Sequence, residues 1–169
     1  MARRLSIDFK LLGNLAHSKN MLMGVAPDIR KAYLRSQSSI ADKLLRIVRR
    51  HLVNQDLSWE PLSLGTIDKK RHDLILIDTE TYLNSIDRFQ SGYNIFVGVK
   101  KGIMEPKTGM EVSRIAALHE FGTELIPARP LWEPSINELG GKSGIKEQFL
   151  NDLASRLTKR GFSILYKRI

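Results

Sequence analysis

The longest hydrophobic pattern in the chain lies between residues 27 and 52. Apolar side chains recur there every three or four positions, the spacing that gathers them on one face of an α-helix. They are Ile29, Tyr33, Ile40, Leu44, Ile47, Val48 and Leu52. Pro27 suits the first turn, because a proline there removes no helical hydrogen bond. The pattern predicts one long amphipathic helix that begins near residue 27.

Shorter patterns predict β-strands. Leu5, Ile7 and Phe9 alternate with polar residues and predict an N-terminal edge strand. Alternation over residues 93–100 predicts a central strand, and residues 74–77, 82–86 and 162–166 are shorter segments that favour extended structure. Most intervals between these segments are too short for crossover helices, so we expect antiparallel pairing.

Helices are expected again after residue 110. Residues 111–121 have helical spacing, with Phe121 able to fill the core beneath the helix and Gly122 placed as a left-handed C-terminal cap. A hairpin-like excursion over residues 102–109 precedes this helix. Residues 131–139 predict a short helix or turn, the glycines at 140, 141 and 144 a flexible linker, and residues 145–157 an amphipathic helix.

Together these elements predict an α+β fold: a small antiparallel sheet packed by a long amphipathic helix, with an extended loop and terminal arms. A chain of 169 residues suits one domain, which we place at residues 1–139, followed by a C-terminal helix and strand extension at 140–169. Residues 54–73 show no periodicity. Loops of that length are usually functional or held by a neighbour, so we expect an ordered arm.

The charge balance is basic. Lysine and arginine number 27 against 18 aspartate and glutamate residues, a net charge of +9. This excess favours a polyanionic neighbour such as nucleic acid, although a solvated basic exterior without a dedicated partner explains it equally well. The candidates for polyanion contact are Arg46, Arg49, Arg50, Lys69, Lys70 and Arg71. A basic nucleic-acid-binding module is therefore the alternative function.

Composition excludes several classes of protein. There is no cysteine, which removes disulfides, thiolate metal sites and cysteine nucleophiles. Ser6 and Asp8 interrupt the first apolar stretch, which therefore does not have the pattern of a signal peptide. No apolar run approaches the length of a membrane span, so no membrane partner is expected.

Motifs for catalysis are incomplete. His119 and Glu120 match the start of a zinc-protease helix, but Thr123 stands where that motif needs its second histidine. Gly141 to Ser143 resemble the end of a phosphate-binding loop, but Ile136 stands at the position of its first glycine. We therefore expect no enzyme, no cofactor and no metal. A hydrolase built on His119 and Glu120 is the rival that a zinc analysis would test.

Two blocks of sequence carry a family resemblance. Residues 115–123 read Ile-Ala-Ala-Leu-His-Glu-Phe-Gly-Thr and residues 126–131 read Ile-Pro-Ala-Arg-Pro-Leu. Residues 59–63 read Trp-Glu-Pro-Leu-Ser and precede Thr66, Lys69, Lys70, Leu76, Thr79, Leu83, Ser85 and Ile86. Both blocks resemble the phage tail-completion and virion-morphogenesis family. Glu80 departs from the pattern, since the family usually has glycine there, and the backbone of that turn can differ.

The resemblance covers roughly residues 27 to 138 and implies a structural subunit of a tailed-phage particle. A tail-completion or head–tail joining protein, or minor tail protein, would act as one copy in a ring of about six. Its partners would be other copies, a tail-tube or tail-terminator protein, a head connector or adaptor protein, and passing DNA. Such a subunit would be assembled in the host cytoplasm and reside at the head–tail interface of the virion.

The resemblance also selects residues for an interface or for positioning loops. They are Trp59, Pro61, Leu62, Thr79, Leu83, His119, Glu120, Phe121, Gly122, Pro127, Arg129 and Pro130. Pro127 and Pro130 would hold Arg129 on a stiff, extended segment, from which its guanidinium can reach a carboxylate or a backbone carbonyl. Two roles are open for these residues: they tie the loop to its own sheet, or they contact a neighbouring subunit.

Overall fold

One long helix organises the protein. The computed structural model describes the backbone of residues 15–159 and the side chains of residues 27–159. The first element is α1 (Leu15–Asn54). It is followed by α2 (Leu64–Lys70), α3 (Thr81–Ser85), β1 (Ile86–Ser91), β2 (Asn94–Val99), α4 (Val112–Phe121), α5 (Trp132–Glu138) and α6 (Gly141–Thr158).

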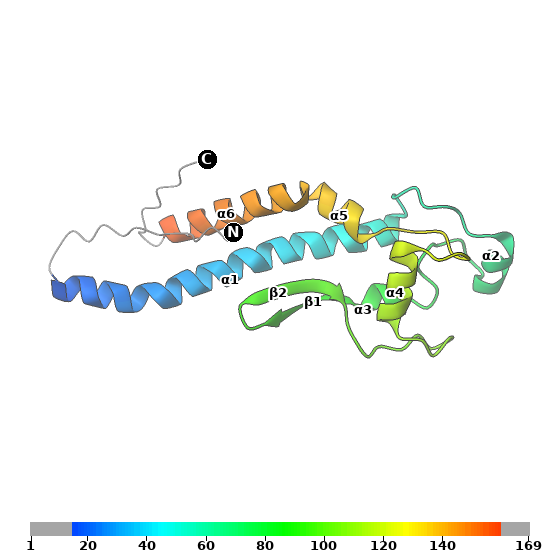
Figure 1. The fold of residues 1–169 in the computed structure, drawn as a ribbon, viewed down its shortest axis with the longest axis horizontal. Helices are drawn as coiled ribbons and strands as arrows, with labels where there is room; N and C mark the ends of the chain where they lie inside the picture. The colour runs from blue at the N-terminus through cyan, green and yellow to red at the C-terminus, as the bar shows by residue number, and fades with distance from the viewer. Residues whose placement is uncertain (1–14, 160–169) are drawn as a thin grey trace.

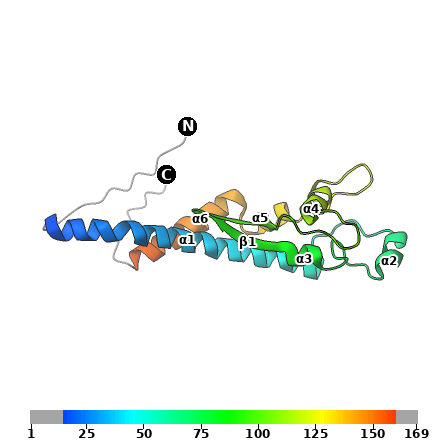
Figure 2. The same ribbon diagram turned by 90° about the horizontal axis from the view of Figure 1, so that it is seen from below.

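The other elements are arranged around α1. Figure 1 shows α5 and α6 along one side of α1 and the β1–β2 hairpin along the other, with α2 and α4 at its C-terminal end. The N-terminal part of α1 extends beyond the hairpin in both views (Figure 2). The predicted α+β class, a small antiparallel sheet packed by a long amphipathic helix, is confirmed.

The core lies at the C-terminal third of α1. Val48 and Leu52, from the predicted apolar face, are fully buried there against Ile86, Leu131 and Val112. Burying one such side chain contributes about 1.5–3 kcal/mol. Because these residues come from α1, β1, α4 and the segment before α5, one cluster fixes the relative positions of those elements.

The hairpin rests on α1 through one face of its two strands. β1 and β2 pair antiparallel, with Ile86 opposite Val99 and Arg88 opposite Val97. Ile86 is part of the core, and the guanidinium of Arg88 lies 3.0 Å from a carboxylate oxygen of Asp42 on α1. Side chains alternate between the faces of a sheet, so Val97 and Val99 share the face of Ile86 and Arg88.

Several boundaries differ from the prediction. α1 begins at Leu15, and Pro27 lies inside it. The reason is that residues 15–23 are rich in strong helix formers such as alanine, leucine and methionine. The arm at residues 54–73 contains the short helix α2. Ser63 is its N-cap, because the Ser63 side chain accepts a hydrogen bond from the amide of Thr66.

The predicted strands were only partly correct. Residues 74–77 form no strand and contain a turn at residues 75–76, and residues 82–85 belong to α3, which buries Tyr82 in the core. β2 is not central, since β1 is its only partner strand among residues 15–159. The N-terminal strand at residues 5–9 and the last strand at residues 162–166 lie outside the described residues.

The glycine-rich stretch is a helix start and not a flexible linker. Gly140 precedes α6, and Gly141 and Gly144 lie within its first turn. A Cβ on Gly144 would come within 2.9 Å of the carbonyl oxygen of Leu139. The glycines therefore serve close backbone packing between α5 and α6, which then lies along α1 (Figure 1).

A polar cluster joins the end of α1 to the following loop and to α5. The ring of His51 lies 2.5 Å from Asp56 through Nδ1 and 3.1 Å from Glu138 through Nε2. Arg50 pairs with the same two carboxylates. The hydrogen bond from His51 lowers the pKa of Asp56, and the hydrogen bond from Arg50 lowers the pKa of Glu138.

The turn before α3 contains a non-glycine residue in the left-handed conformation. Glu80 has φ 62° and ψ −2°, a region that glycine reaches at little cost. The hydroxyl of Thr79 donates to the carboxylate of Glu105 at 2.7 Å and helps to hold the turn. Glu80 thus adopts the backbone of the glycine that the resemblance led us to expect.

We expect Glu80→Gly to stabilise the protein by about 1 kcal/mol, because it relieves the left-handed strain at this position. The free energy of unfolding from urea titrations measures the effect. Glu80→Ala is the matched control, since it removes the carboxylate but keeps the Cβ. An equal gain in both variants would assign the effect to charge and contradict the prediction.

We expect Asp56→Asn to lose stability near neutral pH only. The folded pKa of Asp56 is depressed, so its contribution is present above the unfolded pKa of about 4 and is lost as the pH falls through the folded value. Urea titrations at about pH 7 and about pH 3 should show the difference from the wild type shrinking. Asp68→Asn, at an exposed carboxylate on α2, is the control. A difference that stays constant with pH would refute the role of the cluster.

Candidate assembly interface

The two sequence blocks that carry the family resemblance meet in space. The indole nitrogen of Trp59 donates to the carbonyl oxygen of Pro130 at 2.9 Å. The guanidinium of Arg129 donates to the carbonyl oxygen of Glu60 at 3.2 Å. Nearly seventy residues of chain separate these partners, so the arm after α1 and the segment after α4 form one surface region.

Arg129 is the centre of this region. Its side chain is only 6% exposed, and its backbone amide donates to the carbonyl oxygen of His119 at 2.6 Å. The sequence left open whether the guanidinium would bind a carboxylate or a backbone carbonyl. In the structure it binds the backbone carbonyl of Glu60. A buried charge without such bonds would be costly, so the geometry commits Arg129 to bracing the segment.

His119 lies beside this charge in a partly buried position. Its Nδ1 has no hydrogen-bond partner. Burial lowers the pKa of His119, and the nearby charges of Arg129 and Lys70 lower it further. The imidazole is therefore neutral near pH 7.

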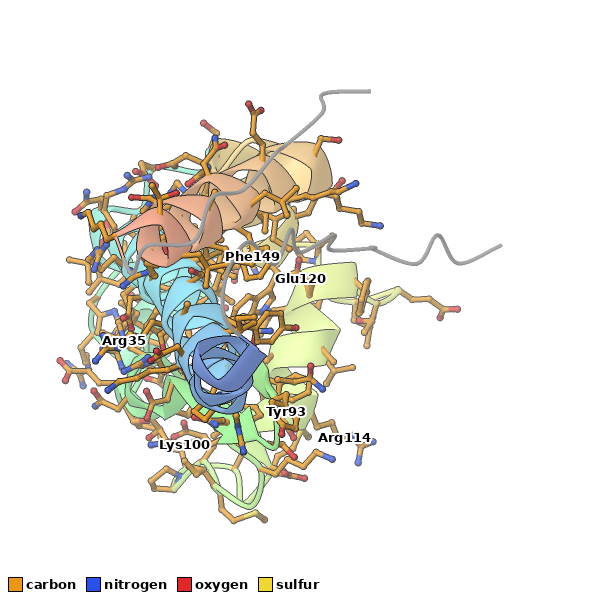
Figure 3. The ribbon with its side chains drawn as sticks, turned by 90° about the vertical axis from the view of Figure 1, so that its left-hand side faces the viewer. Arg35, Tyr93, Lys100, Arg114, Glu120 and Phe149 are labelled. Atoms are coloured by element: carbon orange, nitrogen blue, oxygen red, sulfur yellow. The ribbon has the colours of Figure 1, made fainter. Side chains whose placement is uncertain are left out.

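Glu120 connects the end of α4 to the start of α5. Its carboxylate accepts hydrogen bonds from the amides of Leu131 at 2.8 Å and Trp132 at 3.1 Å. These amides have no partner within their own helix, so the carboxylate caps α5. Glu120 projects from α4 toward the side on which α6 lies (Figure 3).

The loop after α4 is tightly folded around Gly122. The amide of Thr123 donates to the carbonyl oxygen of Ile126 at 2.8 Å, and the Thr123 hydroxyl accepts from the amides of Leu125 and Ile126. Gly122 has φ 71° but an extended ψ of 176°, so it is not the left-handed helical cap that was predicted. The chain turns back so closely there that a Cβ on Gly122 would meet the amide nitrogen of Ala128 at 2.8 Å.

Two apolar side chains project from this braced region. Phe121 is 82% exposed and Leu125 is 94% exposed. The prediction that Phe121 fills the core is wrong. The buried face of α4 is set by Val112 and Ala116, and a residue five positions beyond Ala116 points about 140° away from that face.

Most of the other predicted motif residues pack within the protein's own fold. Leu83 packs against the core cluster, and Leu62 and Pro127 are half-buried. Pro61 is exposed, and Thr79 is bonded to Glu105. Except for Phe121 and Pro61, the motif positions that the structure describes are at least half covered by the protein itself.

The predicted polyanion set is divided. Arg49 donates to the carbonyl oxygen of Ile86 at 2.8 Å, and Lys70 donates to that of Leu74 at 2.5 Å. Arg50 belongs to the carboxylate cluster at the end of α1. The exposed members without a bonded carboxylate or carbonyl are Arg46, Lys69 and Arg71.

An apolar groove of about 860 Å³ runs beside Phe121. Its walls come from β2, α4 and α5, with one residue from the start of α6. The lining residues are Gly98, Val99, Ser113, Ala116, Ala117, Glu120, Phe121, Trp132, Glu133, Ile136, Asn137 and Lys142. Sequence patterns did not identify it, because no single segment carries its signal.

Among residues with described side chains, no three histidine, aspartate or glutamate residues are arranged to hold a metal ion. Within the same part, no helix has the length and apolar character needed to cross a bilayer.

Comparison of the chain with models of known protein families, with curated proteins and with solved structures finds no match.

We expect Gly122→Ala to destabilise the protein by about 2 kcal/mol more than Gly102→Ala. Both glycines have positive φ, but a Cβ at Gly122 would collide with backbone while one at Gly102 would enter open space. Thermal and urea unfolding of the two variants measure the difference. Equal losses would show that the loop yields to the added methyl group.

Proposed function

We propose that this protein is a structural subunit of a tailed-phage particle, a tail-completion or head–tail joining protein that assembles into a ring. The resemblance of the two sequence blocks suggests the class of protein. The observation that carries the proposal is the display of Phe121 and Leu125 on a segment that Glu120 and Arg129 hold through bonds to backbone groups of the same chain.

Two polar residues of this segment stabilise its conformation. Glu120 caps α5, and Arg129 is bonded to the arm at Glu60. A hydrolytic site would instead need His119 and Glu120 to face a substrate together with a metal or a nucleophile. A rigid segment that presents apolar side chains to solvent is typical of a surface that another protein covers.

A ring requires two different surfaces on each copy. A contact between unlike patches repeats around a closed ring when its rotation closes, whereas a contact between like patches stops at a dimer. The end that carries α2 and α4 and the opposite end of α1 are far apart (Figure 1), which gives each copy two unlike ends. A tail-tube or tail-terminator protein and a head connector or adaptor protein would contact the faces of the ring.

A nucleic-acid-binding module is the second candidate. Lys31, Arg35 and Arg46 are exposed at helical spacing on α1. Arg35 lies on the side of α1 opposite Glu120 (Figure 3). Tight DNA binding by a monomer, with an affinity that falls steeply with salt, would favour this function.

We expect the purified protein to form a ring of about six copies, alone or on addition of a tail-tube protein. Light scattering across a concentration series measures the mass. Phe121→Asp should reduce that mass to the monomer without changing the melting temperature, because the side chain is exposed and makes no core contact.

Val53→Asp is the matched control, since Val53 is exposed on α1 outside the groove. It should leave the mass unchanged. A wild-type protein that stays monomeric with and without the tail-tube protein would refute the proposed assembly role.

A further inference from the structure

β2 has a free edge. In an antiparallel pair, alternate residues point their backbone groups away from the partner strand. The amide of Lys100 donates to the carbonyl oxygen of Ser85, so the alternation leaves the amides and carbonyls of Val97 and Val99 pointing outward from β2. No described backbone or side chain is bonded to these outward groups.

The apolar groove lies beside the C-terminal end of β2. Gly98 and Val99 form its wall on the side of β2, and Trp132 and Ile136 of α5 form the wall across from it. Farther along the edge, the amide of Ile95 donates to the side-chain oxygen of Gln37 on α1, so the part of the edge without a bonded partner lies at Val97 and Val99. An open strand edge beside an apolar groove is the site that an added β-strand occupies.

The sheet is small. Two isolated strands are only marginally stable, and packing on α1 supports this pair. The outer face of the hairpin carries Phe89 and Phe96, whose rings stack with centroids 5.8 Å apart and are exposed. A third strand beside β2 would bury its edge and extend this small sheet.

The chain contains one segment with the required pattern. Leu5, Ile7 and Phe9 alternate with Ser6, Asp8 and Lys10 over six residues, the length of β2. Alternation is what a strand needs to place apolar side chains on the face that Val97 and Val99 turn to α1. Arg3 and Arg4, which directly precede the segment, complement the charges of Glu120 and Glu133 in the groove.

A copy cannot place this segment on its own β2. Gln37, which is bonded to the near end of β2, lies 22 residues along α1 from Leu15. At 1.5 Å per residue this is about 33 Å. The five residues from Lys10 to Leu15 reach about 17 Å when fully extended, so residues 5–10 cannot lie along β2 of the same copy.

We propose that residues 5–10 of one copy form a third strand on β2 of the next copy, seated in the groove beside Phe121. The inference rests on the proposed ring and specifies the contact between neighbouring copies. Each copy donates one segment and accepts another, so the contact is head to tail and is repeated around the ring. The main-chain hydrogen bonds come from the β2 edge, and Leu5, Ile7 and Phe9 supply the apolar burial.

The absence of cysteine allows a test in which only contacts between copies are detected. One population of the full chain carries Val97→Cys and a second carries Leu5→Cys, Ile7→Cys or Phe9→Cys. The two populations are mixed, reassembled and oxidised. We expect a disulfide-linked dimer for at least one of the three pairs, because the apolar positions of an added strand share the face of Val97 and pass within bridging distance.

Two controls define the contact. Ser6→Cys should not link to Val97→Cys, since its side chain points to the opposite face, and no segment variant should link to Val53→Cys on α1. In a second measurement, Ile7→Asp should lower the mass of the assembly to the monomer, whereas Ser6→Asp should leave the ring intact.

The outcomes separate the two proposals. A ring that forms normally in the Ile7→Asp variant and gives no link to Val97→Cys would overturn the exchanged strand and leave the proposed function standing. A wild-type chain that never assembles would overturn both. Linkage from Ser6→Cys as efficient as from Ile7→Cys would also contradict the strand, because it would show that the segment has no fixed face.

Discussion

The structure depends on the burial of one stripe of α1. Val48 and Leu52 pack against Ile86 of β1 and Leu131 before α5, so a single apolar cluster holds both sides of the molecule on the helix. This arrangement leaves most of the hairpin and the loop after α4 at the surface. The fold is thus a rod with a small core at one end, and its remaining surfaces are available for other protein chains (Figure 1).

In the loop after α4, polar residues fix the conformation that exposes apolar side chains. Arg129 and Glu120 look chemically active in the sequence, but each is bonded to backbone groups of its own chain. Their bonds fix the path on which Phe121 and Leu125 are exposed. Ordering the loop in advance lowers the entropy cost of binding, which is why a rigid loop suits an assembly interface.

The edge of β2, the groove beside it and the exposed aromatic residues are all surfaces that another protein chain could cover. Among residues 15–159, the sheet has two strands, part of the β2 edge has no bonded partner, and apolar side chains beside it are exposed. The proposed contact with an identical chain would cover these features together. The length of α1 is the reason to propose exchange between copies, because Leu15 lies 22 residues along the helix from Gln37, which is bonded to β2.

The sequence by itself determined the long amphipathic helix, the strand at residues 94–99, the helix ending at Phe121 and the α+β class. Those features follow from periodicity, which is a local property of the chain. Only the tertiary structure decided that Phe121 faces solvent, that Arg129 binds Glu60, that the glycines after Leu139 begin a helix and that β2 pairs with β1 alone among residues 15–159. These facts depend on contacts between residues far apart in the chain, and no local pattern records them.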